Sequence, residues 1–506
     1  MKKFRYLFGI LLMIMAISSC DLDINKDPNY PDDVKGEKYF ASAQMFVAGS
    51  VGGDLQLLGG MWAQHYAQNA GSNQYTNIDS YNLPNSNTYI TRSWSLLYAG
   101  ALADLQISIK KAEATGEWHY WLASKVMTAY TYHVLVEAYG DVPFTESLQF
   151  ETISDPKFDD AKSINQGIIA LLDEAIAKKA DATNPALIDM GTNDFVFGGS
   201  INDWVKFAKS LKLKILMRDP NFANNATAIQ ALLTEGDLLV KDAKIAVFVD
   251  KENNSNPLFE NDRRKLNTQN NIRASSTLAL YLRQTADPRI SVFMEKAKVP
   301  DATLGDYVGL PQGGYTLGAA YQDRSSRALI KAEDPVYFMS VVELDFLKAE
   351  AFVKLNDAAS AKTSYDKAVT GAFARWAGAL DINKTPVFPD NFNVNDFIGA
   401  GKVYEFNQTS AQTMLESIWR QKWIAGVRAQ AWEAFLEINR TGYPNYGTVN
   451  SQSASYVIGT LAPSINTVLP AGQFPKRLIY PKTSTDYNKN TPVAIPIQTK
   501  LWWHKQ

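Results

Sequence analysis

Residues 335–376 carry a hydrophobic pattern that leaves few alternatives to a pair of packed helices. Apolar residues recur at helical spacing over 337–355, and the polar pair Asn356 and Asp357 then interrupts the pattern. The following segment places mostly small residues on one helical face, namely Ala361, Tyr365, Ala368, Ala372 and Trp376. The sequence therefore predicts two antiparallel helices that pack closely through small side chains.

Helical spacing extends over most of the chain, so we expect a mainly α fold. It is most regular over residues 117–139, where one stripe contains Leu122, Val126, Ala129, His133 and Val136. We interpret His133 as a core histidine and not as a ligand. Further helices are predicted at 36–50, 55–68, 93–112, 163–179, 201–217, 226–235, 275–284 and 410–438, and a short strand at 244–249.

The predicted helices are expected to form tetratricopeptide-like hairpins, although the chain has no regular repeat of roughly 34 residues. Gly49, Gly52 and Gly53 are expected to break the chain between the first two helices. Loop-rich excursions are expected near 69–94, 250–335 and 440–506, and long loops are usually functional or disordered. We therefore predict an α-helical scaffold that carries an irregular, ligand-facing part.

The first twenty residues have the pattern of a secretory signal. Three positive charges precede an apolar run over residues 6–17, which is shorter than the roughly 20 residues of a membrane span. Cys20, the only cysteine in the chain, directly follows two serines. We predict a signal peptide at 1–19, a lipid on Cys20, a tether at 20–33 and a single body at 34–506. The alternative is an ordinary signal peptide with an incidental cysteine.

Composition and motifs argue against several classes of function. The net charge is −2 and no basic block is present, which argues against nucleic-acid binding. Four histidines and one cysteine leave no zinc-type cluster, and the chain has no G-x-S-x-G elbow and no phosphate-binding glycine loop. We predict no catalytic residue, no metal ligand and no cofactor. A carboxylate pair for glycoside hydrolysis and a structural calcium on an Asp/Asn loop stay open.

Two polar loops contain aromatic residues of the kind that bind sugars. A Trp or Tyr ring can cover the apolar C–H face of a sugar, while amide or charged side chains satisfy its hydroxyl edges. The candidates in loops 69–94 and 305–324 are Asn73, Tyr75, Tyr81, Trp94, Gln312, Tyr315, Tyr321 and Arg324. For any single aromatic residue, packing under its own loop is the more common role, and Trp94 also opens a predicted helix.

Several short blocks follow one another in order along the chain. They include Asp-Ile-Asn-Lys-Asp-Pro-Asn at 23–29 and Tyr-Gly-Asp-Val-Pro-Phe at 139–144. Near the C-terminus are Gln-Lys-Trp-Ile-Ala at 421–425, Ala-Trp-Glu-Ala-Phe at 431–435, Asn-Arg-Thr-Gly-Tyr-Pro at 439–444 and Phe-Pro-Lys-Arg-Leu-Ile-Tyr-Pro at 474–481. In order and spacing, the blocks resemble the SusD/RagB family of outer-membrane nutrient-binding lipoproteins of the Bacteroidetes.

The resemblance implies a SusD-like fold and a lipoprotein at the cell surface, anchored in the outer membrane. Such a protein binds a nutrient, most often a glycan, and delivers it to a SusC-like TonB-dependent transporter. It is a binding protein and not an enzyme. Three alternatives stay open: an oligopeptide ligand, a lipid-anchored glycoside hydrolase, and a scaffold that binds only the transporter. The family blocks are mostly scaffold, so they do not identify the ligand.

Overall fold

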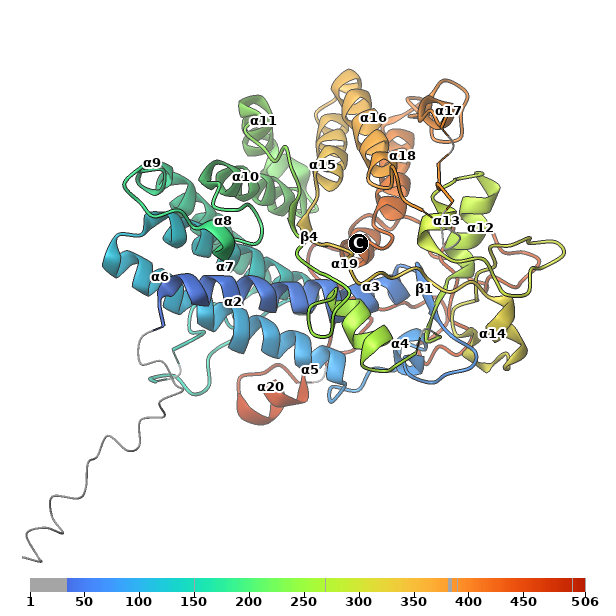
Figure 1. The fold of residues 1–506 in the computed structure, drawn as a ribbon, viewed down its shortest axis with the longest axis horizontal. Helices are drawn as coiled ribbons and strands as arrows, with labels where there is room; N and C mark the ends of the chain where they lie inside the picture. Colours follow the sequence, from blue (N-terminus) through green and yellow to red (C-terminus); the bar gives the residue numbers. More distant parts are fainter. Residues whose placement is uncertain are drawn as a thin grey trace, which may run out of the picture.

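Helices dominate the computed structural model of the protein (Figure 1), which confirms the predicted mainly α fold class. The structure describes residues 34–149, 151–268, 270–380, 385–388, 390–493 and 495–505. The predicted signal peptide at 1–19 and the predicted tether at 20–33, including Cys20, lie outside the described residues. Within the described part of the chain, no helix is both long and apolar enough to cross a membrane.

The helices of the first half include one long helix, against which several of the others pack. They are α2 (Gly36–Gly49), α3 (Leu55–Trp62), α4 (Thr76–Asp79), α5 (Thr88–Ser95), α6 (Ala103–Thr115), α7 (Trp118–Tyr139), α8 (Ala161–Ala177), α9 (Lys179–Ala182), α10 (Ile201–Met217) and α11 (Ala226–Glu235). Helix α7 packs against α2, α6, α8 and α10. Its predicted apolar stripe is buried, and His133 is a core residue as expected.

The second half has shorter helices and two small sheets. The helices are α12 (Ser276–Gln284), α13 (Ile290–Phe293), α14 (Ala320–Arg324), α15 (Val341–Lys354), α16 (Ala358–Ala374), α17 (Asn395–Ile398), α18 (Ala411–Ala425), α19 (Ala431–Thr441) and α20 (Lys482–Tyr487). Two antiparallel strand pairs join β1 (Tyr66–Gln68) to β3 (Ile272–Ala274) and β2 (Ala243–Ile245) to β4 (Val336–Met339). Each pair links distant parts of the sequence.

The predicted helical hairpin is present as α15 and α16, which lie side by side (Figure 1). The Asp357 side chain accepts a hydrogen bond from the Ser360 N–H and so caps the start of α16. The predicted start of the first helix at 337 is wrong, because residues 336–339 form β4 and the cap Ser340 precedes α15. These residues pair with β2 in a two-stranded sheet although their apolar residues recur at helical spacing.

An Ala368→Trp variant is expected to lose roughly 1–3 kcal/mol of unfolding free energy through overpacking, since Ala368 is fully buried on α16. Urea denaturation followed by circular dichroism measures the loss. The control is Thr363→Trp, which adds the same ring to the exposed face of α16. Equal stability of the two variants would contradict the packing of this hairpin.

The glycines at the end of α2 do not break the chain into two helices. Residues Ser50–Asp54 (η2) continue α2 as a wide π-helical turn that runs directly into α3. A Cβ atom added to Gly52 would lie 2.2 Å from Cγ2 of Val336 in β4, so the backbone needs a glycine there. The predicted break at Gly49, Gly52 and Gly53 is therefore wrong, because these small residues permit helix packing.

The predicted second helix is shorter than expected, and the polar loop after it is partly helical. Helix α3 ends at Trp62, and Tyr66–Gln68 pairs with β3 instead of continuing the helix. The predicted loop at 69–94 contains α4 and most of α5, and a second π-helical turn, η3 (Leu96–Leu102), joins α5 to α6. In Figure 1, α14, α4 and α5 follow one another along one edge of the molecule.

A network of ionised side chains lies in the core between the two halves. Its members are the carboxylates Glu137, Glu343, Glu350, Glu433 and Glu437 and the cations Lys214, Arg218, Lys354, Lys422 and Arg440. The buried Arg218 guanidinium at the end of α10 pairs with Glu137 of α7 and with Glu433 and Glu437 of α19. The network thereby ties helices of the N-terminal half to α15, α18 and α19.

The charges in this network stabilise one another. Burial alone would raise the pKa of Glu433, but Arg218, Lys214 and Lys422 outweigh it and hold that pKa below its usual range. Lys214 lies 2.6 Å from Glu433 and Lys422 lies 3.2 Å from it. Burial outweighs the cations at Glu137 and Glu343, where it raises the pKa, so the cations keep Glu433 ionised more effectively than these two.

A candidate ligand-binding cleft

The two loops that the sequence singles out are joined through one buried carboxylate. Asp79 in α4 accepts hydrogen bonds from the N–H groups of Gln68 and Gly313, each at 3.0 Å, and from the Gln312 amide at 3.0 Å. Burial raises the pKa of Asp79 to about 7, and the two N–H donors oppose part of that shift. The loops 69–94 and 305–324 therefore form one structural unit.

Several predicted ligand contacts lie inside this unit. The side chains of Tyr75 and Tyr81 are each 2% exposed, and the Tyr75 hydroxyl donates to Asp262 at 2.6 Å. Gln312 is also buried, and its amide donates to the Met61 carbonyl at 3.1 Å as well as to Asp79. These three side chains form the core of their own loops, and their contact with a ligand stays a prediction.

Trp94 is half-buried and belongs to a cluster of rings. Its ring centroid lies 4.7 Å from that of Tyr98 and 4.9 Å from that of Tyr139, and Phe158 and Tyr480 also pack on it. The prediction that Trp94 opens a helix is wrong, since Trp94 lies inside α5. Packing of α5 on α7 accounts for this side chain.

A Tyr75→Phe variant is expected to lose about 1–3 kcal/mol of unfolding free energy, because the buried Asp262 carboxylate loses a donor. Thermal or urea denaturation measures the change. Tyr321→Phe serves as the control, since Tyr321 is 38% exposed. A Tyr75→Phe protein with unchanged stability and weakened ligand affinity would show that Tyr75 acts on the ligand after all.

The other predicted contacts remain on the surface. Asn73 and Arg324 are exposed, Tyr321 is exposed on α14, and Tyr315 is half-buried. The two loops touch here, since a Cβ atom on Gly71 would lie 2.2 Å from the Gln322 side chain. The structure thus brings the loop at Gly71 close to α14, and contact of these four side chains with a ligand stays a prediction.

An open cleft borders the first loop on its other side. It has a volume of about 950 Å³ including its open side, and it lies between α5, the turn η2 and a third π-helical turn, η6 (Phe259–Arg264). Its polar and aromatic lining consists of Asp54, Gln74, Tyr75, Asn87, Thr88, Tyr89, Arg92, Asn261 and Lys265, so the mostly buried Tyr75 also borders the cleft. We call it the Tyr89 cleft.

The Tyr89 ring is held at the wall of the cleft by its neighbours. The Asn87 side chain accepts from the Tyr89 N–H at 3.0 Å and so starts α5. The ring meets Tyr75 edge-on at 5.8 Å, and the Gln74 amide donates to the Tyr89 hydroxyl at 3.2 Å. The ring is therefore fixed in place while one part of it stays accessible.

A buried ion pair forms the floor of the cleft. Nε of Arg92 donates to Asp54 at 2.7 Å, and a second nitrogen of the same guanidinium also bonds to this carboxylate. Burial raises the pKa of Asp54, against the effect of Arg92, and the Asp54 bond raises the pKa of Arg92. The carboxylate is 1% exposed and the Arg92 side chain 35% exposed, so a ligand meets the cation and not the anion.

The cleft combines an aromatic ring with amide and cationic side chains, which is a chemistry suited to sugars. Tyr89 lies within the predicted loop 69–94 but is not among the predicted contacts, and neither are Arg92, Asn261 and Lys265. The spacing of Tyr89 and Arg92, three residues apart, places them one turn apart on a helix. No local pattern indicates that η6 faces α5.

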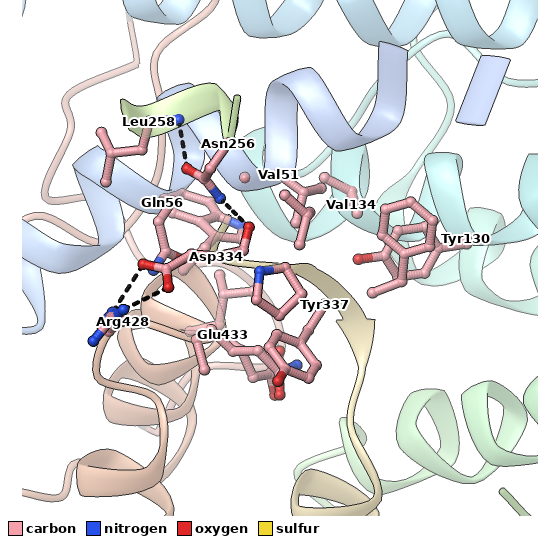
Figure 2. Close-up of a pocket in the computed structure, with 18 of the residues that line it drawn as sticks. Val51, Gln56, Tyr130, Val134, Asn256, Leu258, Asp334, Tyr337, Arg428 and Glu433 are labelled. Atoms are coloured by element: carbon pink, nitrogen blue, oxygen red, sulfur yellow. Dashed lines mark hydrogen bonds and ion pairs between the residues drawn. The ribbon is translucent and has the colours of Figure 1, made fainter. Parts of the chain in front are cut away.

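A second cavity lies deeper, next to the cleft (Figure 2). Arg428 donates to the Asp334 carboxylate at 2.8 and 2.6 Å, and the Asn256 amide donates to the Asp334 carbonyl at 2.9 Å. Leu258 lines both this cavity and the Tyr89 cleft. Most of the lining side chains are buried, so we interpret this cavity as part of the core.

Metal binding finds no support in the part of the chain that the structure describes. No group of three or more His, Cys, Asp or Glu side chains there is arranged to hold a metal ion.

Comparison with known sequences identifies the family of this chain. A family profile described as "Starch-binding associating with outer membrane" matches residues 50–481. The chain belongs to the SusD/RagB family. SusD-like proteins are binding proteins, and the family description associates them with the outer membrane. A search of curated proteins gives no match.

Solved SusD-like structures share the fold of this chain. A SusD homolog from Bacteroides uniformis has a TM-score of 0.72 at 24% identity, covering 92% of this chain and 99% of its own. A SusD/RagB family protein from Bacteroides thetaiotaomicron has 0.71 at 20% identity, covering 94% and 100%. A chitin-binding SusD homolog from Flavobacterium johnsoniae has 0.70 at 20% identity, covering 92% and 97%. At these identities the likeness concerns the fold alone.

Proposed function

We propose that this SusD-like protein binds a glycan in the Tyr89 cleft at the cell surface and delivers it to a SusC-like TonB-dependent transporter. The observation that carries the proposal is an accessible, fixed Tyr89 ring beside the amides of Gln74, Asn87 and Asn261. Family membership supports a glycan ligand, and one structural relative is described as chitin-binding. The exposed edge from Asn73 to Tyr321 would extend the site for a longer chain.

The lining of the cleft argues against a glycoside hydrolase at this place. Hydrolysis of a glycosidic bond commonly needs two carboxyl groups that flank the bond. Asp54 is the only carboxylate among the described lining residues, and it is buried and paired with Arg92. We therefore propose binding without chemical conversion.

An oligopeptide is the second candidate ligand, since Arg92 and Lys265 could pair with its carboxylates and Tyr89 could pack on its side chains. Calorimetry with the full-length protein in detergent distinguishes a glycan from a peptide ligand. The compounds to be titrated are neutral glucan oligosaccharides, chitin oligosaccharides and short peptides. Binding of one glycan class with micromolar or tighter affinity supports the proposal. Binding of peptides but not of glycans would replace the proposed glycan by a peptide ligand. A protein that binds neither ligand and associates only with the transporter would be a scaffold.

A Cys20→Ala variant is expected to remain unprocessed or to be released from the membrane, because the predicted anchor is covalent at the Cys20 sulfur. Membrane fractionation and labelling with a radioactive fatty acid measure the loss. Ser19→Ala is the control, since it keeps the acylated atom. A Cys20→Ala protein that stays on the cell surface would contradict the lipoprotein proposal.

A further inference from the structure

The accessible charge of the Tyr89 cleft is positive, although the whole chain carries a net charge of −2. Three charged side chains line the cleft, namely Asp54, Arg92 and Lys265. The carboxylate is 1% exposed and lies behind the guanidinium that binds it. The two cations are the charges that a ligand in the cleft can reach.

One nitrogen of the Arg92 guanidinium takes no part in its hydrogen bonds to Asp54. Its Nε and Nη2 atoms donate to Asp54, while Nη1 makes no hydrogen bond to any residue that the structure describes. The Asp54 pair fixes the plane of the guanidinium, whose central carbon lies 5.8 Å from the centre of the Tyr89 ring. A sugar that stacks on Tyr89 therefore has a fixed cationic donor beside it.

Lys265 provides a second cation in the lining of the cleft. Its side chain is exposed directly after η6, and no carboxylate in the described ranges forms an ion pair with it. The neighbouring Arg264 differs, because Asp250 and Glu260 neutralise it and it does not line the cleft. Lys265 is thus the adjacent cation that is left unpaired and lines the ligand space.

We infer that the Tyr89 cleft selects acidic glycans, in which a sugar ring carries a carboxylate or a sulfate ester. The ring would stack on Tyr89, and its anionic group would lie between Nη1 of Arg92 and the ammonium of Lys265. This inference rests on the proposed glycan binding and adds the ligand class. Hydrogen bonds between charged partners are about twice as strong as neutral ones, so the anion would dominate selectivity.

The test compares oligosaccharides of equal length that are neutral, uronate-bearing or sulfated. Calorimetry on the full-length protein in detergent should show at least one acidic class binding about tenfold or more tightly than the neutral one. Added salt should weaken acidic binding more than neutral binding, because the cations are partly exposed. The uronate and sulfate arms identify which anion the cleft accepts.

Lys265→Gln is the deciding variant, since Arg92 also holds the buried Asp54 and its loss would disturb folding. The ratio of acidic to neutral affinity should fall about tenfold in Lys265→Gln. Arg264→Gln is the matched control, because it removes the same charge one residue away and should keep the ratio.

Two results would overturn the inference. Equal affinity for neutral and acidic glycans in the wild-type protein would leave glycan binding intact and remove the acidic preference. A preference that persists in Lys265→Gln and is lost in Arg264→Gln would place the anion elsewhere. Absence of binding to every glycan would instead reject the proposed function and, with it, the inferred preference for acidic glycans.

Discussion

An Arg218→Met variant is expected to lose roughly 3–5 kcal/mol of unfolding free energy, the largest loss that we expect from a single substitution in this protein. Methionine fills much of the same space but provides no charge. Glu137, Glu433 and Glu437 would each lose a partner while remaining buried. Because three buried carboxylates lose a partner at once, we expect the cost to exceed that of an ordinary ion pair, although Lys214, Lys422 and Arg440 still pair with two of them.

Urea denaturation with two spectroscopic probes measures the effect of Arg218→Met, and the same protein at lower pH should recover part of its stability as the unpaired carboxylates take up protons. Lys482→Met is the control, because its pair with Asp486 is exposed on α20 and is expected to contribute about 0.3–0.5 kcal/mol. If both variants unfold at the same urea concentration, the network contributes little.

A Tyr89→Ala variant is expected to bind the glycan about 30-fold more weakly than the wild-type protein, since truncating a central aromatic contact costs about 2 kcal/mol or more. The ring lies at the wall of the cleft and its loss removes the stacking surface. Tyr89→Phe should keep most of the affinity, because only the hydroxyl bond to Gln74 is lost. Calorimetry with the preferred glycan measures both.

Tyr487→Ala is the matched control for Tyr89→Ala, because Tyr487 is 81% exposed and does not line the cleft. Tyr321→Ala tests whether the site extends to α14, where a smaller loss is expected for long glycans only. A Tyr89→Ala protein that folds normally and keeps full affinity would place the ligand outside the Tyr89 cleft.

Regular helices could be predicted from the sequence because their apolar spacing and their ends are local signals. The predicted ranges 201–217 and 226–235 coincide with α10 and α11, and Gly236 ends α11 in the left-handed conformation that favours glycine. The hairpin of α15 and α16 was also predictable from its stripe of small residues. At β4 the helical pattern misled, because pairing with β2 involves residues about ninety positions away.

The proposed ligand site was less predictable, since its walls come from segments far apart in the sequence. Loop composition drew attention to residues 69–94, of which Gln74, Tyr75, Asn87, Thr88, Tyr89 and Arg92 line the cleft. Composition could not separate Tyr89, which stays accessible, from Tyr75, which the same fold buries. That difference arises from Asp262 of η6, which accepts the Tyr75 hydroxyl across 187 residues of sequence.

The buried ion network also has a consequence for how this protein can evolve. A substitution of Arg218 alone leaves buried carboxylates without a partner, and a substitution of one glutamate alone leaves buried positive charge without a partner. Each single substitution therefore gives a less stable protein. Paired replacement of a cation and its carboxylate by apolar residues avoids that intermediate. We expect homologues to retain these positions together or to change them together, while the residues of the Tyr89 cleft vary independently as ligands change.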